Sequence, residues 1–219
     1  MQEKVQVILP KKLLKKQNFG KAHRNILYVE INMDNLKELT RQQHMRAEGT
    51  GFIKRLLKKQ ITEYEYYVFM SNQLAMYYVL ETEADRRDIF DGIEEIKRSL
   101  KLSRDLSELE SDFGFEQITN LKSTSEYIKY IQSISDPERL LAHVYVRHMG
   151  DLSGGQIIKR FVPGSGKFYE FEGDIDSLKE KFREKLHDGL ADEAKVCFDM
   201  VTEFMIELES TLGTMEKTD

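Results

Sequence analysis

The sequence is short of several residue types, and each shortage excludes a class of protein. Cys197 is the only cysteine in 219 residues, which excludes an internal disulfide and a zinc site made of several cysteines. Three prolines and no tryptophan, beside abundant Leu, Lys, Glu and Met, favour helices. No apolar run approaches the roughly 20 residues of a membrane-spanning helix, and no signal-peptide core is visible. We therefore expect one domain in a reducing compartment, with no membrane partner.

Charge is distributed unevenly along the chain. Residues 1–30 hold seven Lys or Arg against two Glu, so their net charge is +5 and that of the remainder is −10. A basic segment of this kind can contact nucleic acid or a membrane surface. The aromatic residues that alternate with basic ones in single-strand binding are missing here. We interpret residues 1–32 as a solvated basic extension and expect no nucleic-acid partner.

The hydrophobic pattern predicts an all-α bundle. The basic extension is expected to be irregular, with a little extended structure in KVQVIL and NILYVEIN, ahead of a helical domain at 33–212 and a tail at 213–219. Helices are expected from near Asp34, from Glu63 to about Glu83, over 90–109, and twice within 175–212 with a break at Asp188-Gly189. GSGKFYEFEGD reads as a loop. Helix-starting capping boxes are predicted at Asn35/Glu38, Thr62/Glu65, Ser123/Glu126 and Ser135/Glu138.

The run LSGGQ at residues 152–156 matches the signature of ATP-binding-cassette ATPases. That signature acts opposite a phosphate-binding loop of the form G-x-x-x-x-G-K-[ST]. The Gly-Lys pairs that begin at Gly20 and Gly166 are followed by neither Ser nor Thr. The strand-rich core of such ATPases is missing as well, so we reject a nucleotide site.

The glycines of this run need another explanation, because each costs about 1 kcal/mol within a helix. They lie in one long predicted helix, LLAHVYVRHMGDLSGGQIIKR. Gly150 and Gly154 are four residues apart, as are Asp151 and Gly155, so one face carries a strip almost without side chains. Such a strip permits a kink and lets a flat ligand approach the backbone. Close packing against another helix uses the same feature, and the glycines alone do not decide.

A second group of polar residues shares a face of the helix around His44. At about 100° per residue, Lys37 lies within roughly 20° of His44, and Arg41 within roughly 60°. Glu48, one turn later, would fix the imidazole tautomer. The pattern suits a flat cofactor with a central metal and carboxylates at its rim. A solvated basic face with a chance histidine is the alternative.

The stretches that carry these two features match one known family. ERLLAHVYVRHMGDLSGGQIIKR resembles the distal-helix signature of heme oxygenases, and LKELTRQQHMRAE resembles their proximal-histidine helix. FYEFEGDIDSLKEKFREKL and DEAKVCFDMVTEFMIELE match in the same order, so the resemblance covers about residues 33–212. It implies a single-domain heme-oxygenase-like helical bundle, with heme between a proximal helix and a kinked distal helix.

The resemblance also implies a role for each site residue. His44 would ligate the iron of heme b, oriented by Glu48, while Gly150 and Gly154 would line the distal face. Asp151 would hold a water network that delivers a proton to bound oxygen. The residues bordering the heme, its propionates or this network would be Lys37, Arg41, Tyr145, Arg147, Lys179 and Arg183.

An oxygenase of this family would use O2 to cleave heme to biliverdin, carbon monoxide and ferrous iron, usually at the alpha-meso carbon. The animal members' C-terminal anchor has no counterpart, which predicts a cytoplasmic, plastid-stromal or (if viral) host-cytoplasmic enzyme supplied by ferredoxin and serving a bilin reductase. FIKRLLKKQ would dock the acidic donor, unless it is an ordinary solvated face. The rival function is a non-catalytic heme carrier or sensor, which would not need Asp151 and Arg147. An unrelated helical interaction module would require both motifs to be coincidental.

Two departures from the family pattern stand out. His148 occupies a position where the family often has an aromatic residue, which adds a titrating group near the proton network. Residues 81–122 match only loosely, and the family's aromatic-rich Tyr-Gly motif is reduced to SDFGF. The first departure concerns the proton supply, and the second the wall on the substrate side.

Overall fold

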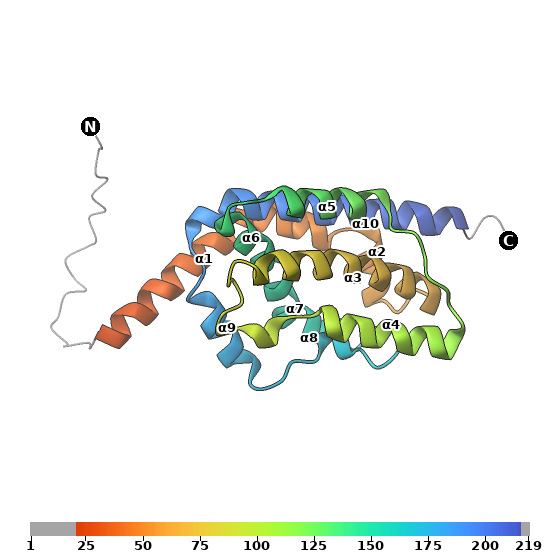
Figure 1. The fold of residues 1–219 in the computed structure, drawn as a ribbon, viewed down its shortest axis with the longest axis horizontal. Coiled ribbons are helices and arrows are strands. Elements are labelled where there is room, and N and C mark those ends of the chain that lie inside the picture. Colours follow the sequence, from red (N-terminus) through yellow and green to blue (C-terminus); the bar gives the residue numbers. More distant parts are fainter. Residues whose placement is uncertain (1–20, 216–219) are drawn as a thin grey trace.

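The structure is a computed structural model that describes residues 21–215, with side chains described over 35–213. Within those residues it is helical and contains no strand, which confirms the all-α prediction (Figure 1). The α-helices are α1 (Lys21–Glu48), α2 (Gly51–Leu57), α3 (Glu63–Asp85), α4 (Ser99–Phe113), α5 (Lys122–Ser133), α6 (Pro137–Val144), α7 (Gly150–Ser153), α8 (Gly155–Ile158), α9 (Ile175–Arg183) and α10 (Ala191–Met215). Shorter turns are the 3-10 helices η1 (Glu94–Ile96), η3 (Lys167–Tyr169) and η4 (Asp188–Leu190), and the π-helix η2 (Tyr145–Met149).

Helix α3 lies at the centre of the bundle. It packs against α4, α5 and α6, while α10 packs against α1, α2, α5 and α6 (Figure 1). The facing side chains are buried, among them Met70 and Leu80 of α3 and Phe204 and Leu208 of α10. Burial of each such side chain contributes about 1.5–3 kcal/mol. This packing fixes the place of α6, η2, α7 and α8, which follow one another over residues 137–158 and are called here the distal segment.

The predicted helix starts have mixed outcomes. The Thr62/Glu65 capping box is present, with both reciprocal hydrogen bonds, and α3 ends near its predicted end. The box predicted at Ser135 is wrong by one residue, because the Asp136 side chain caps α6. The box predicted at Ser123 is also wrong: Glu207 of α10 accepts the Ser123 amide at 2.7 Å. That helix start is therefore capped by a distant carboxylate.

Helix α1 starts well before the predicted position. NILYVEIN, predicted to be irregular, is helical, and KVQVIL lies outside the described residues. Neither Gly nor Pro occurs from Lys21 to Asp34, so a helix that has formed downstream can extend through these residues without interruption. Each β-branched residue among them lowers helix stability by only roughly a few tenths of a kcal/mol relative to alanine. Asn35 is not a cap; its amide donates to Asp188 at 2.5 Å. The domain boundaries at 32/33 and 212/213 stay predictions.

The loop from 164 to 174 is attached to the bundle through two buried polar side chains. The Arg98 guanidinium donates to the carbonyl oxygens of Phe168 (3.0 Å) and Glu170 (2.6 Å). Asp105 accepts the amides of Lys167 (2.9 Å) and Phe168 (2.8 Å). Buried polar groups are stable only when they are bonded in this way. The two attachments hold η3, including Tyr169, against the distal segment.

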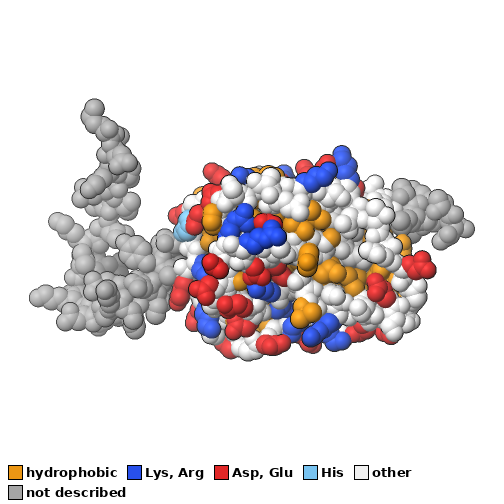
Figure 2. All heavy atoms as spheres, viewed as in Figure 1, with side chains coloured by type: hydrophobic (Ala, Val, Ile, Leu, Met, Phe, Trp, Pro, Cys, Tyr) orange, Lys and Arg blue, Asp and Glu red, His pale blue; other side chains and the backbone are white. Residues whose placement is uncertain are grey.

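The surface is mixed in character. On the face in Figure 2, side chains of both charge signs are interspersed around a band of hydrophobic atoms. Interspersed charges are typical of a solvated face. None of the helices over residues 21–215 combines the length and hydropathy required to span a bilayer.

Candidate active site

A pocket of about 620 Å³ opens between α1 and the distal segment. Its size falls in the range of about 300–1,000 Å³ that small-molecule sites occupy. All but two of the predicted site residues line it, namely Lys37, His44, Glu48, Tyr145, Arg147, Gly150, Asp151, Gly154 and Arg183. Two motifs more than a hundred residues apart in the sequence therefore face one cavity.

His44 lies on the α1 wall of the pocket. Its side chain is 46% exposed, and its Nε2 atom lies 3.5 Å from Glu48 Oε1. The ring meets Phe198 of α10 edge-on, with centroids 5.4 Å apart. One ring nitrogen thus faces a carboxylate, and the other has no hydrogen-bond partner among the described residues. This is the arrangement in which a carboxylate fixes the tautomer of a metal-binding imidazole.

The predicted cations divide into two pairs. Lys37 and Arg183 line the pocket, and the buried Nε of Arg183 has no hydrogen-bond partner within the described part of the chain. Because an unsatisfied buried donor is costly, the unpaired Nε atom indicates that the cavity is built to receive an anionic acceptor. Arg41 and Lys179 lie outside the pocket wall and pair with Glu38 and Asp176, each at 3.6 Å.

The three glycines of the distal segment serve two different needs. A Cβ atom added at Gly150 would meet nothing within 4 Å, and one at Gly154 would meet only the Gly150 carbonyl oxygen at 3.4 Å. A Cβ atom at Gly155 would lie 2.8 Å from Cδ1 of the buried Tyr169 ring. Gly150 and Gly154 therefore keep the pocket open, whereas Gly155 permits close packing. Close packing is thus found at Gly155, where the neighbour is the Tyr169 ring, and the approach of a flat ligand to Gly150 and Gly154 stays a prediction.

This division predicts opposite effects of alanine on the stability of the protein. Gly150→Ala is expected to raise the free energy of unfolding by up to about 1 kcal/mol, since the helix gains propensity without a clash. Gly155→Ala is expected to lower it by about 1–3 kcal/mol, because the Tyr169 ring must move. Thermal or urea unfolding measures both. Shifts of the same sign and size would contradict the division.

The long helix predicted for the distal segment is interrupted twice. Residues 145–149 wind as the π-helix η2, and Gly154 separates α7 from α8. Single π turns inside helices occur frequently at functional sites. Here the turn buries Tyr145, Arg147 and His148. The glycines alone therefore do not account for the break, which begins before Gly150.

Asp151 is the first acidic residue after this turn, and Tyr77 of α3 donates to its Oδ2 atom at 2.6 Å. Burial raises the pKa of the Asp151 carboxyl to about 6, while the Tyr77 hydrogen bond and the positive charges of His148, Arg147 and Arg98 oppose the shift. A carboxyl with such a pKa both gives and takes a proton near neutral pH.

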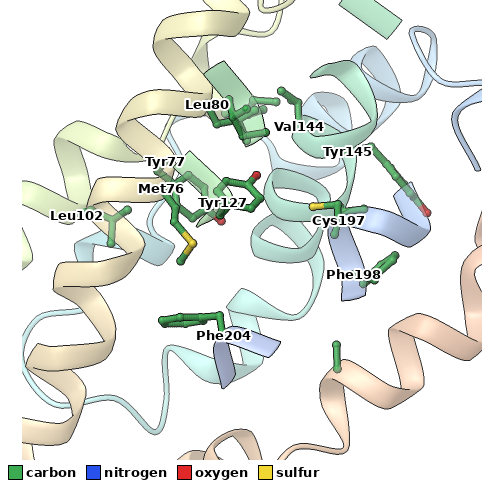
Figure 3. Close-up of a cluster of buried hydrophobic side chains, with 14 of the residues drawn as sticks. Met76, Tyr77, Leu80, Leu102, Tyr127, Val144, Tyr145, Cys197, Phe198 and Phe204 are labelled. Carbon is green, nitrogen blue, oxygen red and sulfur yellow. The ribbon is translucent and has the colours of Figure 1, made fainter. Parts of the chain in front are cut away.

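Arg147 is buried beside Asp151 and is held by aromatic rings. Its guanidinium carbon lies 4.4 Å from the Tyr77 ring centroid and 5.2 Å from that of Tyr127. The guanidinium also donates to Gln73. Figure 3 shows Tyr77 and Tyr127 together with Met76 in the interior of the bundle. Ring faces attract cations, which offsets part of the cost of burying this charge.

Sequence reasoning missed the pocket residues of α3 and η3. Gln73 and Tyr77 lie in a stretch whose aromatic and Met content is typical of a buried helix, and nothing local distinguishes Tyr77 from its neighbours. Phe168 and Tyr169 fall in the predicted loop. The Tyr77–Asp151 hydrogen bond depends on how α3 packs against the distal segment, which no local pattern in the sequence specifies.

Comparisons with known proteins agree with this fold and pocket. The heme oxygenase family model matches residues 32–201. A heme oxygenase 1 from Nostoc is 32% identical over 199 residues, which are 79% of this chain and 84% of that protein. The crystal structure of Synechocystis heme oxygenase-1 in complex with heme superposes with a TM-score of 0.72 at 26% identity, over 83% of this chain and 96% of that one. Synechocystis heme oxygenase-2, in complex with heme and NO, gives a TM-score of 0.74 at 27% identity over 83% and 86%.

The match of the family model over most of the chain settles the family. This protein belongs to the heme oxygenase family. The family is one of enzymes of heme degradation, and the fold is that of the cyanobacterial members.

Proposed function

We propose that this protein binds heme b between His44 and the glycine-lined distal segment and cleaves it to biliverdin IX-alpha, carbon monoxide and ferrous iron. The observation that carries the proposal is that one pocket is lined by His44 of α1 and by the open strip of Gly150 and Gly154 together with Asp151. The Synechocystis structures with the same fold are heme complexes. Bound heme supplies an oxygen-activating iron and is itself the substrate.

The residues of the pocket fit the parts of heme. His44 would hold the iron with Glu48 as its orienting partner, and Phe198 keeps the imidazole ring in place. The unpaired Arg183 Nε and the Lys37 ammonium would take the propionate groups. Arg41 and Lys179 form only long ion pairs of 3.6 Å, with Glu38 and Asp176 respectively. They would exchange these weak pairs for contacts with the outer propionate oxygens. Tyr145, whose side chain lines the same cavity, would border the ring edge.

On the distal side, the chain's own groups handle protons. Asp151 would pass a proton toward the pocket through its carboxyl oxygens, with water as the carrier, and the Tyr77 hydroxyl holds the carboxyl in one orientation. Arg147 adds a fixed positive charge beside it. General acid catalysis is most effective when the pKa of the acid lies close to the working pH. The pKa of about 6 therefore suits Asp151 to supply a proton, through water, close to neutral pH.

We further propose that ferredoxin supplies the electrons and docks on α2 and the turn after it. Lys54, Lys58 and Lys59 are exposed there, and Leu57 and Ile53 of the same helix line the pocket. Arg55 is not available, because it pairs with Glu65 and Glu209. An exposed basic surface beside the pocket favours an acidic electron donor and speeds its encounter.

A single assay tests the function. Hemin is titrated into the protein until the Soret band saturates, and ferredoxin, its reductase and NADPH are then added under air. The expected result is decay of the Soret band, a biliverdin spectrum, and chromatography that identifies the IX-alpha isomer. Ascorbate replaces the ferredoxin system in a parallel sample.

Each other outcome removes part of the proposal. Turnover with ascorbate alone would overturn ferredoxin as the donor and leave the oxygenase. A Soret band that persists with both donors would establish the carrier or sensor function instead. A different biliverdin isomer would overturn only the cleavage position, and no heme binding would overturn the whole proposal.

A further inference from the structure

A buried acid-base pair, formed by His148 and Glu81, lies behind the distal wall of the pocket, and the proposed heme chemistry does not use it directly. His148 of η2 and Glu81 of α3 are buried, with side-chain exposures of 0% and 5%, and their Nε2 and Oε1 atoms are 3.1 Å apart. The His148 ring packs edge-on against Tyr77 and Phe90, with centroids 5.2 Å and 5.3 Å away. The His148 ring thus lies between two aromatic rings.

The hydrogen-bond partners of His148 specify its charge. Its Nε2 atom faces the Glu81 carboxylate, and its Nδ1 atom faces the Val144 carbonyl oxygen at 3.3 Å. A carboxylate and a carbonyl accept hydrogen bonds and do not donate them. Protons on both ring nitrogens, as in an imidazolium, satisfy both contacts.

Glu81 is correspondingly built as an anion. Besides His148, it accepts from the backbone amides of Arg98 and Ser99 and from the Ser99 hydroxyl. Although burial acts to raise the pKa of the Glu81 carboxyl, the donors from His148, Arg98 and Ser99 hold it below its usual value. A buried carboxylate with several donors stays ionised.

This pair is connected to Asp151 in two ways. The Tyr77 ring that packs on His148 carries the hydroxyl that donates to Asp151. The charged and titratable groups facing Asp151 come from four elements: Tyr77 of α3, Arg98 ahead of α4, His148 and Arg147 of η2, and Tyr169 of η3. Glu81 is the anion nearest to His148, and Arg98 also has Glu81 and Asp151 as opposite charges.

We infer that His148, held as an imidazolium by Glu81, is a positioning residue for the heme reaction: its charge balances the Asp151 carboxylate, and its ring fixes Tyr77 as the donor to that carboxylate. The inference rests on the proposed role of Asp151 as the source of the proton. A neutral aromatic ring at this position would pack on Tyr77 but would carry no positive charge, so it would not supply this function.

The test follows the Asp151 carboxyl directly in the heme-free protein. Carbon-13 NMR of aspartate-labelled protein, with the Asp151 signal assigned by Asp151→Asn, gives its titration midpoint. His148→Gln keeps a donor for Glu81 but removes the charge, and is expected to raise the midpoint by about one pH unit, a tenfold rise in proton affinity. His187→Gln is the matched control, because His187 also pairs with a carboxylate, that of Glu138, at the surface. It is expected to leave the midpoint unchanged.

An Asp151 midpoint that is the same in His148→Gln and the parent protein would overturn the inference. If that variant does not fold, nitrogen-15 NMR of the parent imidazole decides: two protonated ring nitrogens at pH 7 support the inference, and a neutral tautomer overturns it. Neither measurement needs heme turnover. Failure of the proposed oxygenase would therefore appear as absent bilin with the midpoint shift intact, whereas failure of this inference would leave bilin formation with no shift.

Discussion

Replacement of His44 by alanine is expected to reduce biliverdin formation by at least about 100-fold, because a metal site loses about 10–100-fold when even a supporting group of its ligand is removed. The variant should fold normally, since the His44 side chain is 46% exposed. Heme should still enter the pocket, with a shifted Soret band that reflects the changed iron ligand. Added imidazole should restore part of the activity by filling the hollow that the side chain leaves.

His187→Ala is a closely matched control for this experiment. The His187 side chain is also 46% exposed and also faces a carboxylate, that of Glu138. It is not among the residues that line the pocket. The absorption spectrum of the bound heme and the rate of bilin formation are measured for both variants. A normal spectrum and a normal rate for His44→Ala would show that the iron is held elsewhere.

Asp151→Asn is expected to bind heme as tightly as the parent protein but to form biliverdin about 10²–10⁴-fold more slowly, the usual contribution of a positioned proton donor. Asn accepts the Tyr77 hydrogen bond in place of the carboxylate, so the pocket wall should keep its shape. With the ordered delivery of the proton lost, the bound heme should either stall or turn to peroxidase chemistry, and a phenolic dye with hydrogen peroxide detects the latter. Biliverdin formation at the normal rate would show that Asp151 is not the proton source.

The same substitution should change stability in a direction that the pKa fixes. Burial raises the pKa of Asp151 from its ordinary 3.8 to about 6, so folding disfavours the ionised carboxyl. This penalty is absent below pH 4, grows as the pH rises toward 6, and is full above it. Heme-free Asp151→Asn should therefore exceed the parent in free energy of unfolding by about 1–3 kcal/mol at pH 7 and match it near pH 3.5.

The sequence predicts those parts of the fold that depend on neighbouring residues. The Thr62/Glu65 capping box forms as expected, because both partners lie within one turn. At Ser123 the same local pattern is overridden, because Glu207 from α10 supplies the acceptor. The early start of α1 is a similar case, in which continuation of a packed helix outweighs weak local preferences.

The site follows the same rule. The spacing of Gly150 and Gly154 and the neighbours of His44 on its helix face each leave a ligand site as one of two interpretations, and the pocket between the two helices is predicted only by the resemblance to heme oxygenases. The partners of these residues were not, because Tyr77 is 74 residues from Asp151 and Glu81 is 67 residues from His148. Such pairings depend on how α3 packs against the distal segment. The different needs met by Gly150 and Gly155 likewise appear only once the Tyr169 ring is placed.

The π-helix at Tyr145–Met149 makes the site sensitive to the number of residues as well as to their kind. A π turn contains about one residue more than an α turn, and each residue of an α-helix advances the direction of the side chains by about 100°. Because the wide turn absorbs the extra residue, removal of one residue here would restore a regular helix and leave Gly150 and Asp151 directed at the pocket. The side chains that the turn buries, Tyr145, Arg147 and His148, would instead be redistributed around the helix, and one position among them would be lost. A relative with one residue fewer between Tyr145 and Asp151 should therefore keep the glycine strip and lose one of the buried groups beside it.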